Sequence, residues 1–293
     1  MTNSIPLENN ATTEIPFNHC PPKIKLYDVN SFDIWALGIT VVIGGQYFSW
    51  NAALSAGLGS CVLGSFLIGT AYSSLCLCTS ELTSAFPFAG GAYGLARCTL
   101  GFYLGFLVGC CETAEYISYV AASAVSLQQI IVSTFPSFIG FEPLLWLIFY
   151  VSALSIHIFG GRFIWKFSRL VATILICLVL LFSFGSLPYV DLKKYAGIQS
   201  GKCFVGGIPE FLRVLPITAW LFVGIEVLNL SCDDVSAPRK IIPRGQISCI
   251  LTLNITAILV IFVSASLPGG IENAASVLAP LNTGTIPLQL VNA

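Results

Sequence analysis

The sequence predicts an all-α protein that crosses a membrane several times, with about seven transmembrane helices of which the first and sixth are broken. Two observations predict this class. The 293 residues are 56% hydrophobic and 9% charged, with a mean hydropathy of +0.86, whereas soluble domains carry about 25% charge. Apolar stretches also recur at the length of about 20 residues that a helix needs to span the hydrocarbon core. The lipid bilayer is therefore an expected partner. A net charge of −1 without a basic block gives no sign of nucleic-acid binding.

Seven apolar segments are long enough to be spans. They lie near residues 33–57, 59–84, 101–131, 143–160, 163–187, 211–232 and 246–267. We expect the polar, Pro-containing residues 1–31 to form a disordered cytoplasmic tail and residues 32–270 to form the transmembrane domain. Residues 271–293 are expected to form a loop.

The distribution of Lys and Arg predicts the orientation. With the N-terminus in the cytoplasm, the inner segments hold nine basic residues and the outer segments hold four, which agrees with the positive-inside rule. The inner ones are Lys23, Lys25, Arg97, Arg162, Lys166, Arg169, Arg239, Lys240 and Arg244, and the outer ones are Lys193, Lys194, Lys202 and Arg213. We expect the membrane to be the plasma membrane.

The first interruption is expected at Gly44 and Gly45. Glycine adopts left-handed or extended backbone without a steric penalty, and a polar run including Gln46 and Tyr47 follows at once. Because hydrocarbon holds no water for free N–H and C=O groups, a broken helix persists only where it lines a polar cavity. The alternative is that the glycines allow close helix packing. The polar run favours a broken helix and makes these four residues candidates for a binding site.

The second interruption is expected at Gly224, Ile225 and Glu226, inside the sixth span. Two interrupted spans far apart in the sequence are typical of a secondary-transporter binding site. Trp220 lies about one helical turn earlier, where its indole could stack on a bound ammonium group. The alternative is an ordinary packed tryptophan.

Carboxylates without basic partners are expected at membrane depth. Glu112, Glu115, Tyr116 and Tyr119 share one face of the third span because they follow at i, i+3, i+4 and i+7. Since no Lys or Arg is expected deep in any span, these acids and Glu226 would stay protonated, bond to freed backbone N–H groups or meet a cationic substrate. Coupling to protons is therefore an expectation. The alternative role of this face is packing through hydrogen bonds to neighbouring helices.

We expect no cofactor, no metal and no enzymatic activity. Most of the eleven cysteines lie in apolar stretches, and neither Cys76–Cys78 nor Cys110–Cys111 has ligands at zinc spacing. The chain contains no His-Glu-x-x-His and no nucleophile with a recognisable base partner. A seven-helix receptor is the other alternative. The cytoplasmic N-terminus and the lack of an Asn-Pro-x-x-Tyr sequence disfavour it.

Several motifs together resemble the amino acid–polyamine–organocation permeases. They are Gly44-Gly45, Glu81 followed by Pro87-Phe88-Ala89-Gly90-Gly91-Ala92-Tyr93, Phe222-Val223-Gly224-Ile225-Glu226, and residues 236–245. The stretch from Gly45 to Asn51 most resembles the ethanolamine-permease branch.

This resemblance implies a leucine-transporter-type fold of two inverted five-helix repeats, here residues 32–187 and the start of a second repeat at 211–270. It implies transport of amino acids or small amines such as ethanolamine by alternating access, proton-coupled or by exchange. Trp220 would occlude the substrate, and Glu112, Glu115 and Tyr116 would face it. The fold needs ten core helices and the sequence supplies seven, so we expect a C-terminally truncated permease. A non-transporting fragment is the alternative.

Overall fold

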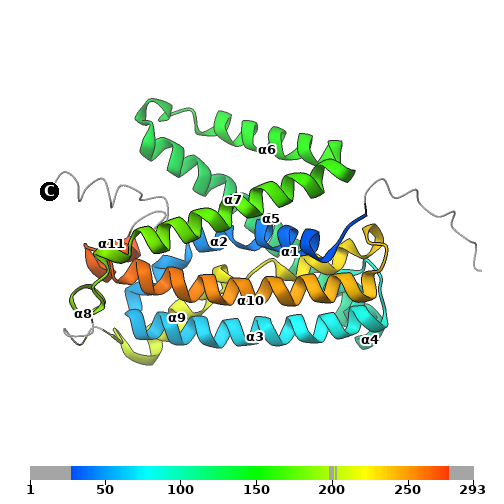
Figure 1. Ribbon diagram of the computed structural model, residues 1–293, viewed down its shortest axis with the longest axis horizontal. Helices are drawn as coiled ribbons and strands as arrows, with labels where there is room; N and C mark the ends of the chain where they lie inside the picture. Colours follow the sequence, from blue (N-terminus) through cyan, green and yellow to red (C-terminus); the bar gives the residue numbers. More distant parts are fainter. Residues whose placement is uncertain (1–27, 198–200, 202, 277–293) are drawn as a thin grey trace, which may run out of the picture.

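The structure, a computed structural model, describes residues 28–197, 201 and 203–276 as a bundle of helices without strands in those residues (Figure 1). The helices are α1 (Ser31–Val42), α2 (Gly44–Tyr47), η1 (Trp50–Ala56), α3 (Leu58–Ala85), α4 (Gly91–Leu100), α5 (Phe102–Thr134), η2 (Pro136–Phe138), α6 (Glu142–Phe159), α7 (Gly161–Gly185), η3 (Leu187–Tyr189), α8 (Leu192–Tyr195), α9 (Gly207–Thr218), η4 (Ala219–Leu221), η5 (Ile225–Asp234), α10 (Pro238–Ala265) and α11 (Gly270–Ser276).

The membrane-spanning character of the chain is confirmed. Five of the described helical segments are long and apolar enough to cross a bilayer, and the apolar helices at Ser31–Val42 and Glu142–Ile158 are shorter. The five are Leu58–Ala85, Phe102–Thr134, Gly161–Tyr189, Gly207–Asp234 and Pro238–Ala265. Together these seven segments correspond to the seven expected spans, and the chain is an all-α multi-pass membrane protein.

The core lies around α1 and α10. Helix α10 packs against α3 and α1, and α7 crosses α1 on the other side (Figure 1). Polar side chains join α10 to α3 at two levels: Gln246 Nε2 donates to Thr79 Oγ1 at 3.0 Å, and Asn254 Nδ2 donates to Ser73 Oγ at 3.1 Å. Gln246 is fully buried, so its amide needs this partner, and the two bonds together fix the rotation of α10 against α3.

Two elements differ from the sequence expectation. Residues 271–276, expected to be loop, belong to the short helix α11, while residues 277–293 and the expected tail at 1–27 lie outside the described part. Helix α4 was not expected as a separate helix. It begins after Gly90, and its Gly91 adopts a φ of 55°, a left-handed conformation that favours glycine.

The first span is broken, as expected, but not at its glycines. Gly44 and Gly45 lie within the helical turn α2. The chain leaves the helix at Phe48, which is extended (φ −149°, ψ 166°), and at Ser49, whose φ is 75°. Ser49 is the one non-glycine residue with a positive φ in the described part of the chain, and this left-handed backbone turns the chain into η1.

The second break lies where the sequence indicates. Helix α9 contains Pro216 and gives way to η4, after which Phe222 (φ −134°) and Gly224 (φ 101°) separate η4 from η5. A Cβ at Gly224 would lie 2.9 Å from Val41 Cγ1 of α1. Gly224 is therefore required both by its left-handed backbone and by close contact with the first span.

Candidate functional site

A pocket of about 310 Å³ lies between α5 and the start of the second break. The residues that line it are Glu115, Ser118, Tyr119, Ala122, Pro216, Ala219, Trp220 and Val223. Among these described residues Glu115 is the one charged side chain. The pocket thus combines one carboxylate, two aromatic rings and a mostly apolar wall.

Trp220 forms the aromatic wall of this pocket. Its indole stacks on the Tyr119 ring, with centroids 5.5 Å apart and an interplanar angle of 24°. The Phe48 ring lies 6.4 Å away at 54°. Faces of tryptophan and tyrosine attract cations, so the rings and the Glu115 carboxylate can act on the same ammonium group.

The acidic face of α5 is divided between two cavities. Glu112 and Tyr116 line a second cavity of about 890 Å³, bounded by α4, α5 and Leu230 of η5. Glu112 Oε2 accepts a hydrogen bond from the Tyr93 N–H at 3.2 Å, and Glu112 Oε1 accepts from the Tyr116 hydroxyl at 3.4 Å. Because the first N–H groups of a helix have no partner inside it, Glu112 caps α4. The acidic face of α5 therefore has both of the roles considered from the sequence. Glu115 lines the pocket beside Trp220, and Glu112 supports packing through its hydrogen bonds to α4 and Tyr116.

Glu226 lies at the second break and is not among the residues that line the pocket. Its Oε2 accepts a hydrogen bond from the Gly224 N–H at 3.2 Å. Its Oε1 is buried and has no hydrogen-bond partner among the described residues. The carboxylate lies within electrostatic range of Glu115 and Glu112, so two further acids act on the charge at this position.

The predicted residues of the first span lie behind the pocket. Tyr47 donates its hydroxyl to the Leu175 carbonyl of α7 at 2.8 Å, and the Gln46 side chain is completely buried. Gly44, Gly45, Gln46 and Tyr47 are not among the residues that line the pocket. In the second span, Ile225 is a core residue with 0% exposure.

Some pocket residues were not predicted. Ser118 and Ala122 lie three and seven residues after Glu115, which is helical spacing, so the periodicity of α5 could have identified them. Pro216, Ala219 and Val223 have no such signal, because the change from α9 to η4 decides which of their atoms face the cavity.

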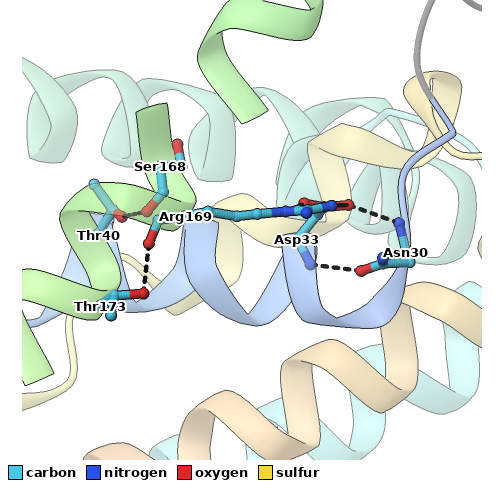
Figure 2. Close-up of polar contacts among 6 residues, drawn as sticks. All are labelled: Asn30, Asp33, Thr40, Ser168, Arg169 and Thr173. Atoms are coloured by element: carbon cyan, nitrogen blue, oxygen red, sulfur yellow. Dashed lines mark hydrogen bonds and ion pairs between the residues drawn. The ribbon is translucent and has the colours of Figure 1, made fainter. Parts of the chain in front are cut away.

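An ion pair joins the start of the first span to α7, and the Arg169 side chain of this pair is 36% exposed. Figure 2 shows Arg169 reaching from α7 to Asp33 of α1, with the Arg169 Nη2 to Asp33 Oδ2 distance at 2.9 Å and a second bond from Nε to Oδ1. Asp33 is fully buried. Its Oδ2 also accepts the Asn30 N–H at 2.9 Å, and Asn30 Oδ1 accepts the Asp33 N–H at 3.0 Å, which is a capping box at the start of α1.

A second hydrogen bond joins the first span to α7, further along α1. The Thr40 hydroxyl donates to the Ser168 carbonyl at 3.1 Å (Figure 2). With the Tyr47 bond to Leu175, three side chains of the first span hold it to α7. The first broken span is thus fixed to α7 at its start, middle and end.

Comparison with known proteins identifies the family. The family model described as amino acid permease matches residues 36–279. The chain is 25% identical over 257 residues to an uncharacterised transporter of Rhizobium meliloti, covering 84% of this chain and 54% of that protein. It is 26% identical over 261 residues to the methylthioribose transporter of Bacillus subtilis, covering 82% and 54%. It is also 26% identical over 246 residues to the lysine-specific permease LysP of Lactococcus lactis, covering 79% and 48%.

The chain spans about half the length of these curated relatives. The matched region includes both interruptions and every residue that lines the pocket. With the all-α membrane fold and two broken helices that meet beside an acidic aromatic pocket, these matches show that the chain belongs to the amino acid permease family.

Proposed function

We propose that this chain carries amino acids or small amines such as ethanolamine across a membrane by alternating access, as a secondary-active transporter. The observation that carries the proposal is the meeting of Glu115 and Trp220, from different spans, in one pocket with no Lys or Arg among its described lining residues. A carboxylate and an indole face both favour an ammonium group. The volume of about 310 Å³ is at the lower end of ligand pockets, roughly 300–1,000 Å³, and suits a small substrate.

The second break favours an amine over an anion. Broken helices often present free backbone N–H groups to anionic substrates. Here the Gly224 N–H is already bonded to the Glu226 carboxylate. A substrate carboxylate at that position would compete with Glu226 and be repelled by it, whereas an ammonium group would be attracted.

The names of three relatives agree with this range of substrates, whereas the methylthioribose transporter lies outside it. The three are a lysine-specific permease, a histidine permease and a cationic amino acid transporter. The permease relatives also support a transporter rather than an enzyme.

Uptake into proteoliposomes tests the proposal. Vesicles containing the 293-residue chain should accumulate labelled lysine, alanine or ethanolamine above protein-free vesicles, and excess unlabelled substrate should abolish the signal. Failure to transport or exchange any of them would contradict the proposal and favour a non-transporting fragment.

For the coupling ion we propose protons, supported by the three acids Glu112, Glu115 and Glu226 around the site. Uptake that follows a sodium gradient and ignores a pH gradient would contradict this.

For the location we propose the plasma membrane with the N-terminus in the cytoplasm, supported by the nine-to-four distribution of basic residues in the sequence. An epitope tag at the N-terminus should react with antibody only after cells are permeabilised. Labelling of intact cells would contradict this orientation.

A further inference from the structure

The indole of Trp220 is held by residues of the first interruption. The ring contacts Tyr119 and Phe48, at centroid distances of 5.5 and 6.4 Å. Tyr119 is itself fixed from the first span, because its hydroxyl donates to the Val41 carbonyl at 2.8 Å. Both aromatic neighbours of Trp220 therefore depend on residues 41–48.

The backbone of Trp220 lies directly against Gly45. A Cβ on Gly45 would overlap the Trp220 carbonyl oxygen, with the carbonyl carbon 2.8 Å away. A backbone carbonyl cannot move aside as a flexible side chain can. Gly45 therefore allows the two broken spans to touch. Its neighbour Gly44 has no such constraint, since the nearest atom to a Cβ there is the Tyr119 hydroxyl at 3.8 Å.

The next residue, Gln46, forms a hydrogen bond to the carbonyl of Leu221, which follows Trp220 in the second break. Its Nε2 donates to the Leu253 carbonyl of α10 at 3.1 Å and approaches the Leu221 carbonyl at 3.5 Å. Carbonyl oxygens only accept hydrogen bonds, so the amide nitrogen must face them. Because Gln46 and Leu221 are both fully buried, water cannot replace this donor, and its loss leaves buried carbonyls unpaired.

We propose that Gly45 and Gln46 are positioning residues that set the place of Trp220 in the pocket wall, although neither lines the pocket. Gly45 gives the clearance for the Trp220 carbonyl, and Gln46 ties the adjacent Leu221 carbonyl to α10. The first broken span therefore affects substrate through the shape of the second. The effect on substrate affinity rests on the proposed function, but the placement of residues 219–227 does not.

Two adjacent glycines offer a matched test. Gly45→Ala should speed amide hydrogen exchange in residues 219–227 by about tenfold, measured by mass spectrometry on the chain in nanodiscs without substrate, because the break must move away. Gly44→Ala should leave that exchange within about twofold of wild type. Equal exchange in the two variants would overturn the proposal, as would an increase spread equally over α3 and α10.

Gln46→Met tests the same idea without added bulk, so the inference can still be tested if Gly45→Ala does not fold. It removes the donor to Leu221 and Leu253 and keeps the length of the side chain. We expect faster exchange in residues 219–227 and a KM for labelled substrate about tenfold higher, with kcat within about twofold. Gln129→Met changes an exposed glutamine of α5 outside the pocket and should change neither.

The readouts separate the two proposals. If wild-type protein transports nothing, the proposed function fails and the exchange comparison still decides the role of Gly45 and Gln46. If wild-type protein transports and Gln46→Met matches Gln129→Met in exchange and KM, the positioning role is wrong and the function stands.

Discussion

Arg169→Met should destabilise the protein through Asp33, because it leaves a fully buried carboxylate without its cation. Removing one partner of a buried ion pair costs about 3–5 kcal/mol. The Arg169 side chain is 36% exposed and Asp33 is 0% exposed, so solvent screening lowers the expected loss to about 2–4 kcal/mol. In a domain of this size each kcal/mol corresponds to about 2–4 °C in the melting temperature. We expect a fall of roughly 5–12 °C for the protein in detergent.

A double-mutant cycle separates the ion pair from general packing. Asp33→Asn removes the charge but keeps the shape, and it should relieve most of the loss caused by Arg169→Met. The two effects should then differ from additivity by about 1.5 kcal/mol or more. Arg213→Met is the matched control, because Arg213 is 71% exposed in its ion pair with Glu210 and exposed pairs contribute about 0–1 kcal/mol. Additive losses, or an equal loss in Arg213→Met, would refute the reasoning.

Three further predictions concern the site. Gly224→Ala should lower the melting temperature by several degrees, because a φ of 101° costs about 1–3 kcal/mol and the new Cβ meets Val41. Gly185→Ala, with nothing within 4 Å of its Cβ, is the control that should not change it. Glu112→Leu should speed amide exchange at the start of α4 and leave KM unchanged, whereas a raised KM with slow exchange would assign Glu112 to substrate. Glu115→Gln should raise the KM for lysine about tenfold, and an unchanged KM would remove Glu115 from the site.

The sequence predicts the spans and the second break well. Composition and apolar length decide whether a segment is a span, and these are local properties of the chain. Gly224 is also a local signal, since its backbone conformation (φ 101°) favours glycine. The number of broken helices and the pairing of Glu115 with Trp220 therefore follow from the sequence and the resemblance together.

The sequence could not predict contacts between distant residues. Gly45 looks like a flexible hinge, but it is helical, and its lack of a side chain matters because of Trp220, 175 residues later. Asp33 and Arg169 are 136 residues apart, so charge counts along single spans do not reveal their pairing. Ser49, which carries the left-handed turn, is a residue type without a strong preference for that conformation.

The most direct test of the central claim is equilibrium binding of labelled lysine and ethanolamine to the purified chain in nanodiscs, for wild type, Glu115→Gln and Trp220→Ala. If α5 and the second broken span form an amine pocket, wild type binds at least one of the two ligands saturably, and each substitution weakens that binding about tenfold or more. The exposed Gln129→Met should bind like wild type. Binding that is equal in all four proteins, or absent from wild type, would contradict the account.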